Sequence, residues 1–265
     1  MKYIFDNDLH IHSEISCCSG DPEQTPERIL NYAEKNGLKT VCLTNHFWDE
    51  NVKSNLNDFY AKQDYAYICT DKPLPQSQGV RFLFGCEAEL DSNYNLGVSK
   101  ERIDLFDFIV IPTTHLHMIG FTVTEEQIKD VSSRADTWVK RFDAVLNMDL
   151  PFNKVGIAHL TCGLIAPKRE DTLETLKLIP ESEMKRLFTK AAKLRVGIEL
   201  NFDDMKFKDE EADIILRPYK IAKECGCKFY CGSDAHNPDV FESAKKVFER
   251  AIDLLSLTED DKFII

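Results

Sequence analysis

The feature that most constrains the fold is a regular alternation of short apolar runs with longer helical patterns. The apolar runs are rich in Val, Ile and Phe, as is typical of strands buried in a parallel sheet. The candidate strands comprise residues 3–8, 40–43, 81–87, 106–113, 154–159, 195–200 and 228–232. Alternation of strands and helices indicates parallel strands joined by helical crossovers. The sequence therefore predicts an α/β fold whose sheet is either open and doubly wound or closed into a barrel.

Helical patterns fill most of the spaces between these strands. Thr25, Pro26 and Gly37 are typical of an N-cap, a first helical turn and a C-cap, and they delimit a helix over residues 27–36. Further helices are expected over residues 124–146, 180–194, 209–224 and 238–255. Residues 49–79 do not fit the alternation, and we interpret them as an insertion with a short helix and a loop. Because no linker or internal repeat divides the 265 residues, we expect a single domain over residues 1–265.

The chain is acidic, with 45 Asp and Glu residues against 33 Lys and Arg residues and a formal net charge of −12. Long nucleic acids and anionic membranes attract basic surfaces, so neither is an expected partner. No run approaches the ~18 apolar residues of a membrane span, and Asp6 and Asp8 interrupt any signal-peptide core. Nine cysteines without CxxC spacing are expected to be free thiols, as in a reducing compartment. We therefore expect an unprocessed, cytoplasmic protein.

The seven histidines share one property, because each lies at, or just past, the C-terminal end of a candidate strand. They are His10, His12, His46, His115, His117, His159 and His236. Glu87 and Asp234 have equivalent positions. The C-terminal ends of parallel strands open on one face of a fold, so these side chains are expected to converge there. These groups predict a site for one metal ion or two adjacent ions. Imidazole suits Zn, Fe, Mn and Ni, and the carboxylates allow harder ions such as Mn or Mg.

Longer motifs resemble a known family over nearly the whole chain. The segments DLHIHSEIS, TPERILNYAEKNGLKTVCLTNH, GCEAEL, TTH, GIAHLT, IELN and GSDAH resemble the PHP superfamily, which is named for polymerase and histidinol phosphatase. The resemblance implies a distorted seven-stranded β/α (TIM-like) barrel that holds two or three metal ions. It also implies a phosphoesterase, since family members of this size are mostly phosphoesterases and include histidinol-phosphate phosphatases.

The resemblance also implies a ligand for each ion. These ligands are His10, His12 and Asp234 for the first ion, His115 and His159 for the second, Glu87 as the bridge between these two, and His46 and His236 for the third. Two positions depart from the family pattern. Cys18 stands where some members have a histidine, with Asp21 as a nearby carboxylate, and a thiolate ligand would favour zinc. His117 has no clear counterpart and is either close to the substrate or a packing residue.

These features predict the hydrolysis of a small phosphate monoester. Divalent ions about 3.5–4 Å apart bind phosphoryl oxygens and lower the pKa of a bound water, so we expect metal-bound hydroxide to attack the phosphorus. Glu87 is the central catalytic residue, and His236, His117 or a metal-bound water would protonate the leaving alkoxide. Histidinol phosphate is the substrate that the family suggests.

Other functions are compatible with the sequence. An amidohydrolase would cleave C–N bonds on a similar barrel, although no lysine lies at a strand end, where such enzymes present a bridging ligand. A phosphodiesterase for short nucleotides and a metal-binding module without activity are further alternatives. Cys162 near His159 is a weak candidate for a nucleophile. Lys168 and Arg169 either contact a substrate phosphate or lie in a solvated loop.

Overall fold

Short parallel strands form the centre of the protein in the computed structural model, which describes residues 1–54 and 60–265. The strands are β1 (Asn7–Ile11), β2 (Thr40–Leu43), β3 (His46–Phe47), β4 (Arg81–Phe84), β5 (Cys86–Ala88), β6 (Ile109–Pro112), β7 (Val155–Ala158), β8 (Gly197–Asn201) and β9 (Lys228–Gly232). Every pairing between these strands is parallel. The predicted α/β class with a parallel sheet is therefore confirmed.

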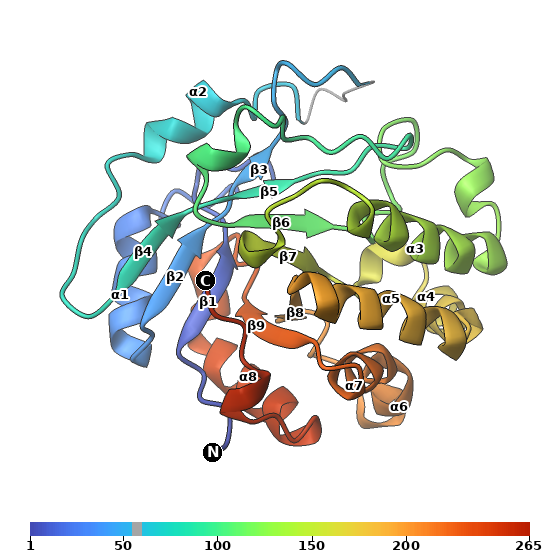
Figure 1. Ribbon diagram of the computed structural model, residues 1–265. Coiled ribbons are helices and arrows are strands. Elements are labelled where there is room, and N and C mark those ends of the chain that lie inside the picture. The colour runs from blue at the N-terminus through green and yellow to red at the C-terminus, as the bar shows by residue number, and fades with distance from the viewer. Residues whose placement is uncertain (55–59) are drawn as a thin grey trace.

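The strands belong to two sheets, with the orders β1-β2-β4 and β3-β5-β6-β7-β8-β9. Backbone contacts join β1 to β9, because the amide of Asp234 donates to the carbonyl of His10 at 2.7 Å and Ile11 forms a parallel bridge with Ala235. Figure 1 shows β1 and β9 next to each other at the centre of the molecule. At the opposite edge, β4 leads into β5 through Gly85. The C-terminal ends of the strands in both sheets therefore surround one region.

The described residues form nine strand segments where seven strands were predicted, because β3 was not predicted and the strand over residues 81–87 is divided. The predicted strand 81–87 is interrupted at Gly85, where a Cβ atom would collide with the backbone oxygen of Phe108. The first strand is also displaced, since β1 covers Asn7–Ile11 rather than residues 3–8. Tyr3 and Phe5 precede β1 and pack into the hydrophobic core. The apolar pattern alone therefore predicted this strand too close to the N-terminus.

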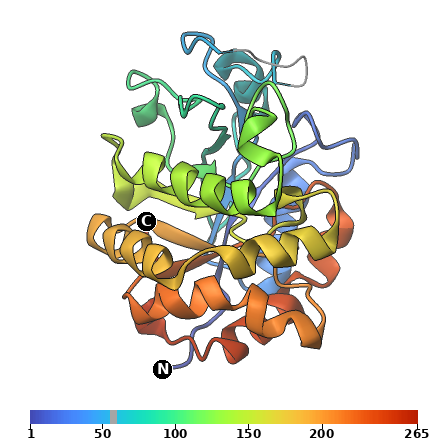
Figure 2. The same ribbon diagram turned by 90° about the vertical axis from the view of Figure 1, so that its right-hand side faces the viewer.

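Helices cover the outside of the strands. They are α1 (Pro26–Asn36), α2 (Tyr65–Ile68), α3 (Val131–Leu146), α4 (Arg169–Leu178), α5 (Glu181–Leu194), α6 (Ala212–Ile215), α7 (Arg217–Glu224) and α8 (Ala244–Leu254). Figure 2 shows α3, α4, α5 and α7 as one layer on the face that is turned toward the viewer. None of the helices in the described part of the chain is long and apolar enough to cross a bilayer.

The helix boundaries follow the signals in the sequence with four exceptions. The helix expected over residues 124–146 begins only at Val131, because the Asp130 side chain caps it there after a short 3-10 turn. The helix expected over residues 238–255 begins only at Ala244, after a separate 3-10 helix at Pro238–Glu242.

The Thr25 hydroxyl accepts a hydrogen bond from the amide of Arg28, and Gly37 ends α1 with a φ of 70°, as predicted. The expected helix over residues 209–224 is divided into α6 and α7, and Pro218 lies in the first turn of α7, where its missing amide is tolerated. Helix α4 was not predicted, because its sequence carries threonines at two of its three buried positions.

The stretch interpreted as an insertion, residues 49–79, contains α2 and a loop that returns to β4. Its Tyr60 side chain is buried and packs with Trp48 and Phe121 in a small aromatic cluster. The Tyr60 hydroxyl lies 3.0 Å from Nδ1 of His46. The insertion therefore contributes a side chain to the region where the histidines meet.

Candidate metal centre

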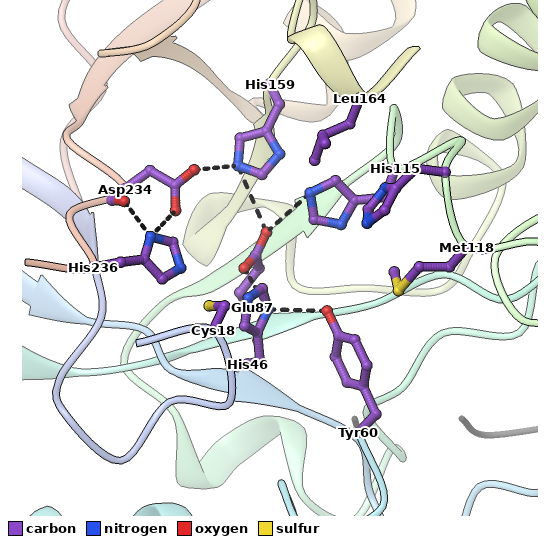
Figure 3. Close-up of a pocket in the computed structure, with 11 residues that line it drawn as sticks. Cys18, His46, Tyr60, Glu87, His115, Met118, His159, Leu164, Asp234 and His236 are labelled. Atoms are coloured by element: carbon purple, nitrogen blue, oxygen red, sulfur yellow. Dashed lines mark hydrogen bonds and ion pairs between the residues drawn. The ribbon is translucent and has the colours of Figure 1, made fainter. Parts of the chain in front are cut away.

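The predicted side chains converge at the C-terminal ends of the strands. Figure 3 shows the pocket that they line, with Glu87 at its centre and histidines from several strands around it. The lining residues are Cys18, His46, Tyr60, Glu87, His115, His117, Met118, His159, Leu164, Asp234 and His236. His10 and His12 do not line the pocket and are fully buried. The structure thus brings together every histidine that the sequence singled out, with Glu87 and Asp234.

His10 and His12 are held with their Nε2 atoms 3.1 Å apart. Nδ1 of His10 lies 2.7 Å from Glu199, and Nδ1 of His12 lies 3.0 Å from the hydroxyl of Ser16. An acceptor at Nδ1 favours the tautomer whose Nε2 carries a lone pair. Two lone pairs that face each other at this distance repel unless a cation or a proton lies between them. This geometry fits a shared metal ion.

Glu87 lies at the centre of the histidines. Both of its carboxylate oxygens are buried, and no backbone amide or hydroxyl of residues 1–54 and 60–265 donates to them. One oxygen lies 2.7 Å from Nδ1 of His46, and the other lies 3.6 Å from Nε2 of His159. Burial alone would raise the pKa of Glu87, but His46 and His10 outweigh it and hold that pKa well below its ordinary value. The carboxylate is therefore ionised and is placed to contact two ions.

His115 and His159 lie on the other side of Glu87. Nδ1 of His115 lies 2.6 Å from Glu89, which directs Nε2 toward the pocket. Nε2 of His159 lies 3.2 Å from Asp234, and Nδ1 of His159 is buried without a hydrogen bond to a described residue. His159 and Asp234 have backbone φ values of 55° and 51°, which residues other than glycine rarely adopt. Such backbone strain is concentrated at functional sites.

The donor atoms form overlapping groups in which all atoms lie within 4.8 Å of one another. The groups are His10, His12, Glu87 and Asp234; Glu87, His115 and His159; His10, His159 and Glu199; and His12, Cys18, His46 and His236. The first, second and fourth groups contain the three ligand sets that the family resemblance implies, and the fourth also contains His12 and Cys18. Asp21 belongs to none of the groups within the described residues. The buried oxygens and ring nitrogens without partners fit divalent cations, because burial of such groups is costly unless they are bound.

Glu199 and Glu89 were not predicted. Each lies against Nδ1 of a histidine and fixes which ring nitrogen faces the pocket. Glu89 follows Glu87 by two residues and so lies on the same side of the strand. That spacing was a usable signal for Glu89. Glu199 lies in β8 within the IELN segment, which contains no histidine to mark it as part of a metal site.

Three of the weaker candidates do not fit an active role. Burial raises the pKa of the Cys162 thiol well above its ordinary value, so Cys162 stays protonated and is a poor nucleophile. Arg169 is the first residue of α4 rather than part of a loop, and its guanidinium forms a bidentate pair with Glu211 at 3.0 and 2.8 Å. This pairing occupies the face of Arg169 that a phosphate would need. Lys168 lies at the N-cap of α4, outside the pocket-lining residues.

Metal binding to this site is expected to strengthen as the pH rises. Burial by itself lowers the pKa of His159, but Asp234, Glu199 and Glu87 outweigh it and raise that pKa to about 9. The metal-free imidazole therefore carries a proton at neutral pH, and an ion must displace it. Between about pH 6 and about pH 9, affinity should increase and each binding event should release protons. Calorimetric titration of zinc into chelator-treated protein, in buffers of different ionisation enthalpy, measures both the affinity and the number of protons released. An affinity that does not change with pH would contradict the expectation.

Comparisons with known proteins agree with this geometry. A model of the PHP domain matches residues 8–201. The fold is similar to that of histidinol phosphate phosphatase (HISK) from Lactococcus lactis subsp. lactis Il1403, solved with Zn, L-histidinol and phosphate, at 17% identity and a TM-score of 0.51 over 94% of each chain. A protein of Listeria monocytogenes proposed to be histidinol phosphatase hisK aligns at 14% identity with a TM-score of 0.60, over 88% of this chain and 96% of that one.

No curated protein sequence matches the chain significantly. The match to the PHP model nevertheless covers well over half of the residues, and it spans β1 through β8 with most of the proposed ligands. This protein belongs to the PHP domain family.

Proposed function

We propose that this protein is a metal-dependent phosphoesterase that hydrolyses a small phosphate monoester. The observation that carries the proposal is the position of Glu87, whose two buried oxygens face histidine nitrogens on either side. Divalent ions bound there would neutralise charge on phosphoryl oxygens and lower the pKa of a bound water. Zinc is one candidate, since the Lactococcus relative was solved with Zn; manganese and iron suit the same ligands.

The side chains of this chain would hold the ions and orient the phosphate. We assign His10, His12, Glu87 and Asp234 to the first ion, His115 and His159 with Glu87 to the second, and Cys18, His46 and His236 to the third. Glu199 and Glu89 keep Nδ1 of His10 and His115 occupied, so that Nε2 of each ring faces the ions. Loss of such an outer partner typically lowers metal affinity about 10–100-fold.

His236 and His117 are the candidates for proton transfer to the leaving alkoxide. Nδ1 of His236 lies 2.7 Å from the carbonyl of Asp234, so Nδ1 donates and Nε2 has its lone pair toward the pocket. That arrangement suits a metal ligand better than an acid. His117 lines the pocket without belonging to any of the ligand groups among the described residues. Burial and the neighbouring His115 lower the pKa of His117 to about 4, so His117 is neutral at pH 7 and unsuited to protonate the alkoxide. We therefore assign metal binding to His236 and contact with the substrate to His117.

The two sheets are best explained as one distorted barrel of seven strands. In this description β2 with β3, and β4 with β5, each count as one interrupted strand. The amides of Cys86 and Glu87 donate to the carbonyls of Phe108 and Asn45, which continues the pairing across the interruption. The contacts between β1 and β9 close the ring. We also propose the cytoplasm as the location, because all nine cysteines are free thiols.

The substrate class is tested with a panel of phosphate monoesters, phosphate diesters and amides on metal-loaded protein. The monoester reaction is expected to dominate, and histidinol phosphate belongs in the panel because the Lactococcus relative was solved with L-histidinol and phosphate. An amidohydrolase site typically includes a lysine ligand, and no lysine lines the pocket within the described residues. Turnover of an amide without phosphate release would overturn the proposal, as would a preference for diesters.

Cys18 is expected to be a thiolate ligand of the third ion. It shares a donor group with His12, His46 and His236, and thiolates favour soft ions such as zinc. Protein loaded with cobalt in place of zinc should show a near-ultraviolet thiolate-to-cobalt charge-transfer band. The Cys18→Ser variant should lose this band, whereas Cys17→Ser should keep it. An unchanged band in Cys18→Ser would exclude Cys18 from the site.

A further inference from the structure

A second cavity adjoins the metal pocket. It has a volume of about 360 Å³, and the metal pocket has about 160 Å³. His117 and Leu164 line both cavities, so they form the boundary between them. Figure 3 shows Leu164 next to His159 and His115, on the side of the pocket opposite Cys18. Since ligand pockets usually measure about 300–1,000 Å³, the metal pocket alone is too small for an ester and its leaving group.

The second cavity has a mainly apolar lining. Its apolar residues are Leu116, Ile119, Ile128, Leu164, Ala166 and Pro167. Ile119 and Leu164 are unusual among large apolar residues, because they are 58% and 40% exposed. Apolar side chains left exposed beside an active site indicate a surface that a ligand covers. A leaving group with an apolar body would bury both of them.

Arg134 from α3 supplies the positive charge in this cavity. One Nη atom donates to the carbonyl of Ile165 at 2.6 Å. No carboxylate of a described residue lies within ion-pair distance of the guanidinium, although Asp171 acts on it from farther away. The described lining contains no Asp or Glu. A half-buried guanidinium with unused donors in such surroundings is suited to a carboxylate or a phosphate.

We propose that this cavity is the leaving-group subsite, and that it selects a monoester whose alcohol has an apolar body and a remote carboxylate or phosphate. The inference rests on the proposed phosphatase function, because it assigns the reacting phosphate to the metal pocket. Arg134 is the specificity-determining residue. Histidinol carries positive charge and would meet Arg134 with no acidic residue in the lining to offset the repulsion. Histidinol phosphate is therefore a poorer substrate than an anionic analogue.

The test compares monoesters that differ only in the group remote from the phosphate. The set comprises phenyl phosphate, 4-carboxyphenyl phosphate, 4-(2-carboxyethyl)phenyl phosphate, 1,4-phenylene bisphosphate, 4-(aminomethyl)phenyl phosphate and histidinol phosphate. The kcat/KM of the best anionic ester, a carboxylate ester or the bisphosphate, should be at least about tenfold higher than that of the aminomethyl ester. A single charge-assisted hydrogen bond is enough for a difference of this size. The two kinds of anionic ester show which anion Arg134 prefers.

Variants of Arg134 isolate its contribution. In Arg134→Gln, the kcat/KM ratio of anionic to aminomethyl ester should fall to about one, and Arg134→Glu should reverse it. Both values are taken on one preparation, so the ratio is unaffected by loss of folded protein. Arg134→Lys should restore part of the preference. Lys140→Gln removes an exposed cation of the same helix that lines neither cavity, and it should leave the ratio unchanged.

Binding to metal-free protein separates this proposal from the phosphatase function. Chelator-treated wild-type protein should bind 4-hydroxybenzoate or 3-(4-hydroxyphenyl)propanoate in a calorimetric titration, and Arg134→Gln should bind it at least about tenfold more weakly. If no ester releases phosphate but this binding is seen, the proposed function fails and the subsite stands. If all esters react at equal rates, or histidinol phosphate is the best of the set, the function stands and the subsite proposal is overturned.

Discussion

The Glu87→Gln variant should lose phosphatase activity by at least about 10³-fold, the upper range for removal of one group that stabilises charge in a transition state. The glutamine side chain has the same shape but only one oxygen and no charge. It would leave His46 and His159 without the shared carboxylate that lies 2.7 and 3.6 Å from their ring nitrogens. The metal content per chain should fall in parallel, because Glu87 belongs to two of the ligand groups.

Two matched substitutions show whether the loss is specific. Glu89→Gln removes the outer partner of His115 and should lower metal affinity by about 10–100-fold. Glu242→Gln removes a carboxylate from the surface, where Glu242 pairs only with exposed Lys35 among the described residues, and should change nothing. Metal analysis and phosphate release are measured on all three variants. A Glu87→Gln protein with wild-type turnover would remove Glu87 from the active site.

The Arg141→Met variant should lose about 3–5 kcal/mol of unfolding free energy, the range for breaking a buried charge network. Arg141 lies on α3 and is fully buried. Its guanidinium donates to the backbone carbonyls of Leu90, Asp91, Pro112, Thr113 and Thr122. It also lies 3.5 Å from the Glu89 carboxylate. Methionine fills similar space and favours helix, but it leaves these oxygens buried without their donor.

Urea-induced unfolding measures this loss, with Arg186→Met as the comparison. Arg186 lies on α5 and pairs with Glu183 and Asp143, but its side chain is 46% exposed. Exposed pairs contribute at most about 1 kcal/mol. Arg141→Met should also weaken metal binding, because the same guanidinium lies against the carboxylate that orients His115. Equal stabilities of the two variants would show that the carbonyl network contributes little.

The centre of the site could be predicted from the sequence because parallel strands impose it. Histidines that are far apart in the chain follow different strands, and the C-terminal ends of those strands lie on one face. The spacing of His10 and His12 alone placed both rings on one side of an extended chain, and their Nε2 atoms are 3.1 Å apart. These inferences use only the direction and period of a strand, which local sequence determines well.

The parts that could not be predicted depend on contacts between distant residues. No local pattern shows the roles of Glu199 and Arg141, since one lies in a strand without histidines and the other in an ordinary amphipathic helix. Their roles arise from what they face in the folded protein, His10 and a set of loop carbonyls respectively. The interruption at Gly85 likewise follows from its close approach to Phe108. The cavity beside Arg134 is formed by segments that only tertiary packing brings together.

An acidic chain with this site can still bind an anionic substrate. The formal net charge of −12 describes the whole molecule, whereas only Glu87 and Asp234 among the proposed ligands are carboxylates. Two or three divalent ions would make the pocket locally positive, since bound ions are often the largest local charges in a site. The acidic exterior then favours a substrate small enough to enter the pocket rather than a polymer that lies along the surface.

Stepwise metal titration of chelator-treated protein, with phosphate release followed at each addition, tests the central claim most directly. The metal-free protein should be inactive. Phosphate release should appear as the second ion per chain binds, because Glu87 belongs to the ligand groups of two adjacent ions. Full activity in metal-free protein, or complete activity with a single ion bound, would contradict the account.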